Sequence, residues 1–354
     1  MLTEAAVRAS LAEIPYPGLS RDIVSLGLVR SVAVRDDRVH VSLALASPRE
    51  DVPDRLRDAV RERLARAGAI RSEVQILTPA GRPPSRGDPW AERGHLPGVR
   101  HVVAVGAGKG GVGKSTVAVN LALALRELGL RAGLLDADIY GPSVPVLLGL
   151  EDGARRVRMT EQRQILPLEG HGLAVVSFGF FLGAASPAVW RGPMVSKAVR
   201  QFSRGVLWPD LDVLVVDLPP GTGDVPLSLA QSIVVDGAVV VTTPQRLATL
   251  EAGKAIEMFR KLEVPVLGVV ENMSHAVCDC GRRSFPFGHG GAEALCRAAS
   301  CALLAQVPFD QATVAGEDSG TPIMAGRPQG EAAEAFRAAA LQVRAALAPQ
   351  GAAR

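Results

Sequence analysis

A glycine-rich loop between an apolar run and a helical run constrains the fold of this chain more than any other segment. Its residues are Gly108, Lys109, Gly110, Gly111, Val112, Gly113, Lys114, Ser115 and Thr116. The pattern G-x-x-x-x-G-K-S lets consecutive backbone N–H groups turn inward around phosphates. The apolar residues 102–105 predict a buried parallel strand before the loop, and residues 117–128 predict a helix after it. The sequence therefore predicts a P-loop, in which Lys114 reaches the β- and γ-phosphates and the Ser115 hydroxyl binds Mg²⁺.

Buried strands and helices alternate along the rest of the C-terminal part of the chain. Strands are predicted near 101–107, 132–136, 173–178, 213–217, 237–242, 265–271 and 302–307, and helices at 193–205, 226–234 and 247–260, among others. This alternation predicts an α/β fold, a parallel sheet with helices on both faces. In such sheets the ligand binds at the carboxyl ends of the strands.

The chain of 354 residues is long enough for two domains. Residues 1–78 predict a small α+β domain, because Val39, Val41 and Leu43 alternate with polar residues and an amphipathic helical pattern follows. Residues 79–98 are rich in Pro, Gly and Arg and predict a linker. Residues 99–354 then form the P-loop domain.

The composition is that of a globular protein, with 47% hydrophobic and 21% charged residues. A net charge of +3 without a dominant basic run, and with only two tyrosines, does not favour nucleic-acid binding. No apolar run reaches the roughly 18 residues that a membrane span needs. The N-terminus lacks the pattern of a secretory signal, so we expect a cytoplasmic protein. Its four cysteines are then expected to be thiols or metal ligands rather than disulfides.

Acidic residues follow two of the predicted strands. Asp217 ends the apolar run 213–216 and corresponds by position to a Walker B aspartate, which holds Mg²⁺ through water. Residues 218–224, rich in Pro and Gly, predict a loop that rearranges when the γ-phosphate leaves. Asp136 ends another strand, so its carboxylate is expected to point at the nucleotide, and Asp138 follows two residues later. The alternative is that these two acids cap a helix.

Asn272 follows the predicted strand 265–271. Its amide can donate to and accept from the edge of adenine, and the alternative is an Asx-turn at the strand end.

Cys278 and Cys280 lie one residue apart in a loop. Two thiolates cannot complete the four-thiolate set of a [4Fe–4S] cluster or a structural zinc site, but a symmetric dimer supplies four. The simplest metal site would therefore bridge two chains. The alternatives are zinc in place of a cluster, and two small buried residues. Cys296 and Cys301 are predicted to be core residues.

The loop with its second lysine resembles the deviant Walker A ATPases, the MinD-like class. In that class the lysine equivalent to Lys109 crosses a dimer interface to the partner's nucleotide. The resemblance also implies that Asp138 orients or activates the attacking water, that Asp136 helps hold the magnesium shell, and that Asn272 recognises the base.

Nearly the whole chain resembles the Mrp/ApbC (NUBP-like) family of P-loop iron–sulfur cluster carriers. The resemblance rests on residues 108–116, 136–143, 190–194, 217–224, 271–274 and 287–291. It implies ATP, Mg²⁺ and a [4Fe–4S] cluster, a homodimer, and apo iron–sulfur client proteins and scaffold donors as partners. Two departures are C-x-C in place of the usual C-x-x-C, and Ala107 in place of the usual serine. For Trp190–Met194 the sequence suggests no physical role.

The N-terminal segment from Asp22 to Pro48 resembles the MIP18-type domain of iron–sulfur assembly proteins. Residues 46–51 contain no cysteine where many members have one, so we expect a docking or regulatory role.

The function hypothesis is an ATPase that holds a labile [4Fe–4S] cluster between two chains and delivers it to apoproteins, with weak ATP hydrolysis. One rival is a positioning ATPase of the MinD or ParA kind, acting on membrane or DNA. Its membrane form needs a basic amphipathic terminal helix, whereas residues 331–348 are Ala-rich with two arginines. The other rival is an ATP-coupled redox protein like the nitrogenase iron protein, whose bridging cysteines are well separated.

Overall fold

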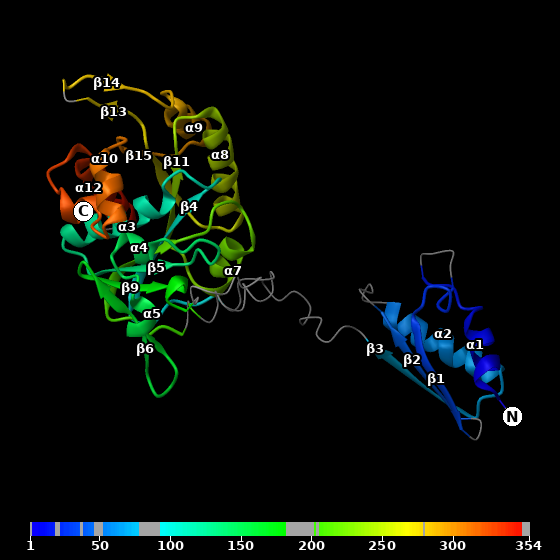
Figure 1. Cartoon of the computed structure of the whole chain (residues 1–354). Helices are drawn as coiled ribbons and strands as arrows, with labels where there is room; N and C mark the ends of the chain where they lie inside the picture. The colour runs from blue at the N-terminus through cyan, green and yellow to red at the C-terminus, as the bar shows by residue number, and fades with distance from the viewer. Residues whose placement is uncertain are drawn as a thin grey trace, which may run out of the picture. The chain divides into compact units, whose positions relative to one another are not determined.

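The computed structural model describes residues 2–17, 22–35, 38–45, 52–77, 93–181, 202, 205–278 and 280–348. Its contacts divide the chain into a first unit, Met1–Pro89, and a second unit, Trp90–Arg354 (Figure 1). Most of the predicted linker, 79–98, lies outside the described residues. Of its described part, Leu96 is buried in the core of the second unit and the Gly94 backbone pairs with Ile233. No helix of the described parts is both long and apolar enough to cross a bilayer.

The first unit packs two helices on a three-stranded sheet. Its elements are α1 (Glu4–Leu11), β1 (Val29–Arg35), β2 (Arg38–Ala44), α2 (Val52–Arg66) and β3 (Arg71–Leu77). Strand β2 is central, antiparallel to β1 and parallel to β3. One face of β2 and one face of α2 are apolar, and these faces pack together. Val39, Val41 and Leu43 of β2 are thereby buried in one cluster with Leu56 and Val60 of α2. Residues 46–51 lie outside the described residues.

The second unit is built on an eight-stranded sheet in the order β15-β12-β11-β4-β10-β5-β9-β8. These strands are β4 (Val99–Ala107), β5 (Ala132–Asp136), β8 (Leu168–Gly170), β9 (Leu173–Ser177), β10 (Leu211–Asp217), β11 (Gly237–Thr242), β12 (Val266–Glu271) and β15 (Leu303–Gln306). All neighbours pair in parallel except β8, which runs antiparallel to β9 at one edge. The predicted parallel α/β fold is therefore confirmed.

Helices cover both faces of this sheet (Figure 1). The longer ones are α3 (Lys114–Glu127), α7 (Asp224–Ser232), α8 (Arg246–Lys261), α9 (Gly291–Ala299), α10 (Gln311–Asp318) and α12 (Glu331–Leu347). Shorter elements are α4 (Val144–Leu147), α5 (Gly153–Arg156), η1 (Phe178–Phe180), α11 (Ile323–Gly326) and the strands β6 (Arg158–Met159), β7 (Ile165–Leu166), β13 (Ala276–Val277) and β14 (Arg283–Ser284). Along β4, Val103 and Val105 join the core under α3 and α12, whereas Val102 and Ala104 join the core under α7, α8 and α9.

Several sequence predictions differ from the structure in their bounds. The P-loop helix begins at Lys114 rather than at residue 117, because Gly113 ends the loop with a left-handed backbone, φ +76°. The edge strand β8 was not predicted, since three residues are too few for a periodic signal. The predicted helix 193–205 and Trp190–Met194 lie almost entirely outside the described residues.

The strand register gathers the acidic residues at one edge of the sheet. Asp217 ends β10 and lies beside Asp136, which ends β5. Asp136 in turn lies beside Ser177, which ends β9. The P-loop leaves β4, the other neighbour of β10, at the same edge. The chain topology thus places the predicted nucleotide residues together.

Candidate nucleotide site and cysteine hairpin

The P-loop needs its glycines for conformation and for close packing. Gly111 and Gly113 have positive φ, +77° and +76°, which L side chains rarely adopt. Gly108 lies against the backbone of α8, where a Cβ atom would be 2.1 Å from the Glu251 carbonyl. The loop therefore rests directly on α8.

Lys114, Ser115 and Asp217 form a compact polar cluster. The Lys114 Nζ atom lies 2.7 Å from Asp217 Oδ1 and 3.6 Å from Asp138 Oδ2. The Ser115 hydroxyl donates to Asp217 Oδ2 at 2.6 Å. Lys114 is 7% exposed and Asp217 is fully buried, so this ion pair is shielded from water.

Asp136 is buried beside this cluster. Ser177 Oγ donates to its Oδ2 at 2.7 Å, and the Asp138 backbone N–H donates to its Oδ1 at 3.1 Å. Burial and the neighbouring Asp217 raise the pKa of Asp136 to about 7. Burial also raises the pKa of Asp217, although Lys114 opposes the shift.

The donor set fits a hard divalent cation. Two buried carboxylates, Asp136 and Asp217, are adjacent on neighbouring strands, and buried Lys114 is the ion-pair partner of Asp217. With the Ser115 hydroxyl they supply only oxygen donors, the type that Mg²⁺ prefers. The alternative that Asp136 and Asp138 cap a helix finds no support, since no helix begins within three residues of either and Ser143 precedes α4.

Lys109 is half-buried and forms no hydrogen bond or ion pair with the part of the chain that the structure describes. Asn272 is buried, and its Nδ2 donates to the Val112 carbonyl of the P-loop at 3.0 Å. The side chain packs so closely that a Cβ atom on Gly113 would lie 2.2 Å from Nδ2. Asn272 thus touches the P-loop, and its recognition of adenine stays a prediction.

Glu317 is a residue of this region that the sequence did not reveal. It lies on α10, accepts from Thr116 Oγ1 at 2.9 Å and has Asn120 Nδ2 3.5 Å away. Burial, together with Asp318, raises the pKa of Glu317 to about 7. The contact joins residues 201 positions apart, and no local pattern marks it.

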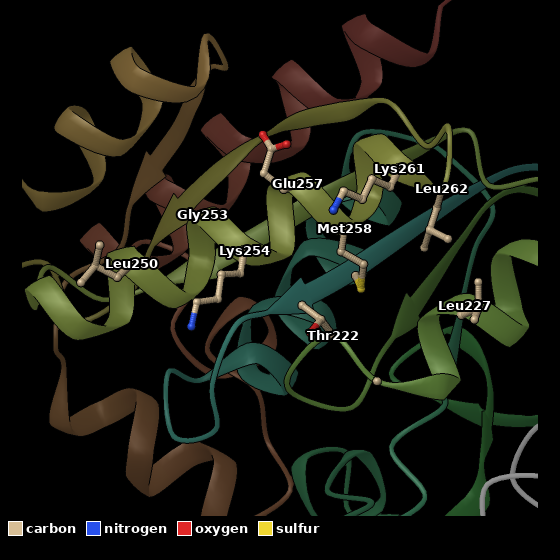
Figure 2. Close-up of a pocket in the computed structure, with 10 residues that line it drawn as sticks. Thr222, Leu227, Leu250, Gly253, Lys254, Glu257, Met258, Lys261 and Leu262 are labelled. Carbon is tan, nitrogen blue, oxygen red and sulfur yellow. The ribbon is translucent and has the colours of Figure 1, made fainter. Parts of the chain in front are cut away.

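The loop that follows Asp217 borders an open pocket of about 680 Å³. Its lining is shared by the loop, α7 and α8: Thr222, Gly223, Leu227, Leu250, Gly253, Lys254, Glu257, Met258, Lys261 and Leu262 (Figure 2). Thr222 and Gly223 thus border open space, and the rearrangement of the loop stays a prediction.

Cys278 and Cys280 lie at the tip of a short hairpin formed by β13 and β14 (Figure 1). The turn is closed by hydrogen bonds from Cys278 N to Arg282 O, 3.1 Å, and from Gly281 N to Cys278 O, 2.8 Å. Both cysteines are exposed, which contradicts the alternative of two buried small residues.

The two sulfur atoms are joined as a disulfide, with an S–S distance of 2.23 Å. The expectation that all four cysteines are thiols or metal ligands is therefore wrong for this pair, because the turn brings the Cα atoms within 5.3 Å of each other. Binding of metal by these sulfurs requires reduction to thiolates.

Cys296 and Cys301 are free, and both pack against the core on the α8 and α9 side of the sheet. Cys296 is 6% exposed, and burial raises the pKa of its thiol to about 12. Such a thiol stays protonated, as expected of a core residue rather than a metal ligand.

Both units match known protein families. The sequence model of a family described as NUBPL iron-transfer P-loop NTPase matches residues 98–344. That of a family described as iron–sulfur cluster assembly protein matches residues 4–76.

Two relatives align along nearly their whole length. An iron–sulfur cluster carrier protein of Deinococcus radiodurans is 44% identical over 344 residues, which cover 96% of this chain and 94% of the relative. The protein of the same description from Escherichia coli K12 is 42% identical over 355 residues, with 98% and 93% covered.

Solved structures resemble the second unit. A nucleotide-binding protein from Archaeoglobus fulgidus in complex with ADP has a TM-score of 0.58 at 37% identity, covering 68% of this chain and 93% of its own. The cell division ATPase MinD of Pyrococcus furiosus has a TM-score of 0.50 at 22% identity, covering 69% and 98%, and this likeness concerns the fold alone.

Proposed function

Because this chain belongs to the NUBPL-type iron-transfer P-loop NTPases, we propose that it is an ATP-dependent carrier of iron–sulfur clusters. Two copies would hold one labile [4Fe–4S] cluster between their Cys278 and Cys280 pairs and transfer it to apoproteins. ATP binding and slow hydrolysis would shift the dimer between holding and releasing states, through a difference in cluster affinity between those states.

The nucleotide half of the proposal assigns roles to the P-loop and to the aspartates at the adjacent strand ends. Backbone N–H groups of residues 108–116 would cradle the phosphates, with Lys114 neutralising their charge. Ser115, Asp217 and Asp136 would hold Mg²⁺, which neutralises charge on the phosphates when it is bound. Asp138 would orient the attacking water, and its position 3.6 Å from Lys114 Nζ supports this role.

Two further residues of the nucleotide half act at its periphery. Lys109 would reach the nucleotide of the second copy, and Asn272 would contact the base. In support, Lys109 has no partner among the described residues, so it is available to a second chain.

The cluster half rests on the exposed cysteine hairpin, the observation that carries the proposal. Reduction of the Cys278–Cys280 disulfide by an external dithiol takes up two electrons and two protons and leaves two thiols and an oxidised dithiol. The thiols lose their protons when they ligate iron. One chain then supplies two thiolates of the four, and a twofold-related copy supplies the others.

The test is anaerobic reconstitution of the reduced full chain with iron and sulfide, followed by Mössbauer spectroscopy and metal analysis with and without ATP. We expect about one [4Fe–4S] cluster per two chains. Cys278→Ser and Cys280→Ser should abolish it, whereas Cys301→Ser, which changes a half-buried free cysteine, should retain it. Zinc in the reconstituted protein, or a cluster that survives both hairpin substitutions, would contradict the proposal.

The proposal includes apo iron–sulfur proteins and scaffold donors as partners, docked in part by the first unit, and a cytoplasmic location. It includes no membrane or nucleic-acid partner.

On α12, Arg337 pairs with Glu127 at 2.7 Å and Arg344 donates to the Leu128 carbonyl, so both arginines are engaged with the α3 region. Robust co-sedimentation with anionic vesicles or DNA would instead favour the positioning ATPase, and reversible reduction without transfer would favour the redox protein.

A further inference from the structure

The base of the cysteine hairpin is anchored by one carboxylate outside it. Glu331, the first residue of α12, accepts through Oε1 from Arg283 Nη2 of β14 at 2.5 Å. The same oxygen lies 3.1 Å from His275 Nε2, in the residue that precedes β13. Glu331 thus contacts both β14 and the residue that leads into β13.

The hairpin has few contacts of its own to fix its orientation. Its ladder has two residues in each strand, and isolated two-stranded hairpins are marginally stable at best in water. Among the described residues, Glu331 is the only side chain outside the hairpin that hydrogen-bonds to β14. Glu331 is therefore a contact through which α12 can influence the direction in which Cys278 and Cys280 project.

A short stretch of chain runs from this anchor to the P-loop. His275 is 7% exposed, and its Nδ1 lies 2.8 Å from Ser274 Oγ. Ser274 bonds through its N–H and its hydroxyl to the Val307 carbonyl, 2.9 and 3.0 Å. Two residues earlier, Asn272 contacts the P-loop carbonyl of Val112. Asn272, which contacts the P-loop, is therefore only three residues from His275, which contacts Glu331. A movement of the P-loop at Val112 could reach the hairpin through this short segment.

A second connection runs through α12. This helix packs on α3, the helix that begins with Lys114, and Phe336 is fully buried in the core that the two helices share. Glu127 and Arg337 add an ion pair between them. Glu331 therefore joins the hairpin to a helix that is itself packed against the P-loop helix.

We propose that Glu331 is a positioning residue that couples the Cys278–Cys280 hairpin to the nucleotide site through His275 and Arg283. This inference rests on the proposed carrier function and names the contact by which ATP would alter cluster affinity. Without Glu331, the hairpin would keep its two-residue ladder but would no longer follow movements of α12 and residues 272–275.

The test measures cysteine reactivity, which requires no cluster. The full chain is reduced anaerobically, and alkylation of Cys278 and Cys280 by iodoacetamide is timed by mass spectrometry, with and without Mg²⁺ and a non-hydrolysable ATP analogue. For the unsubstituted protein we expect nucleotide to change the rate about fivefold or more, the lower range of coupling between sites.

Three variants separate positioning from folding. Glu331→Ala removes the contacts to His275 and Arg283 and should bring the ratio of the two rates within about twofold of one. Glu331→Gln keeps an acceptor oxygen and should give an intermediate ratio. Glu334→Ala removes an exposed carboxylate one turn along α12 and should behave as the unsubstituted protein. Alkylation of the buried Cys296 reports unfolding in the same spectra.

An unchanged ratio in Glu331→Ala would overturn the inference, as would its loss in Glu334→Ala. If Glu331→Ala exposes Cys296, Glu331→Gln decides, and a ratio equal to that of the unsubstituted protein would overturn it. Failure of the carrier function is a separate result. It would abolish reconstitution and leave nucleotide-dependent alkylation intact, whereas failure of the coupling inference would leave reconstitution intact and give Glu331→Ala the same ratio as the unsubstituted protein.

Discussion

Replacement of Glu317 by glutamine should flatten the pH dependence of stability in the second unit. Burial raises the pKa of Glu317 from its ordinary value of 4.5 to about 7. Between these values the folded chain binds more protons than the unfolded chain, so the free energy of unfolding falls as pH rises. Glutamine removes the ionisation and keeps an acceptor for the Thr116 hydroxyl.

The magnitude follows from the two pKa values. From about pH 5.5 to about pH 8, ionisation of Glu317 should cost the folded state about 2 kcal/mol, and its partial exposure reduces this to about 1–2 kcal/mol. The unsubstituted protein should lose that much more stability over this interval than Glu317→Gln. Asp136 and Asp217 contribute equally to both proteins, so the difference isolates Glu317.

Urea unfolding followed by tryptophan fluorescence measures this difference. The three tryptophans are residues 90, 190 and 208, so the signal comes from the second unit. Glu334→Gln, which changes an exposed carboxylate on α12, is the matched control and should keep the pH dependence of the unsubstituted protein. Parallel curves for Glu317→Gln and the unsubstituted protein would refute the reasoning.

Three further substitutions, with Gly110→Ala as a control, test the P-loop and the aspartate at the end of β5. Gly108→Ala should lower the free energy of unfolding by about 1–3 kcal/mol through overlap with α8, whereas Gly110→Ala, whose Cβ would be 4.0 Å from its nearest neighbour, should change it little. Lys109→Ala should leave unfolding unchanged and abolish the ATP-dependent dimer in sedimentation velocity. Asp136→Asn should raise stability above about pH 7, where the buried charge is present, and reduce Mg²⁺-dependent hydrolysis.

The nucleotide edge could be predicted because its residues follow from local patterns. Asp136 and Asp217 each end a short apolar run, and parallel strands bring such ends to one edge regardless of their separation in sequence. Lys114 and Ser115 follow from the spacing of the loop. The lysine–aspartate contact was not predicted, because it depends on the side-chain conformation within the assembled cluster.

The contacts that tie the site to the rest of the second unit could not be predicted. Glu317 and Glu331 are ordinary surface-type residues on helices, and their partners lie far away in sequence. The disulfide between Cys278 and Cys280 was missed for a different reason. Compartment and composition argue for free thiols, whereas the turn geometry that lets the sulfurs meet is set by the β13–β14 ladder.

The ion pair between Lys114 and Asp217 makes nucleotide binding an exchange of partners. Lys114 Nζ lies 2.7 Å from Asp217 and would have to share its three N–H donors between this carboxylate and the phosphate oxygens. The Ser115 hydroxyl donates to the same carboxylate. The dissociation constant for MgATP would therefore include the free energy of any weakening of these internal contacts. A substitution that weakens these contacts without touching a phosphate should therefore tighten nucleotide binding.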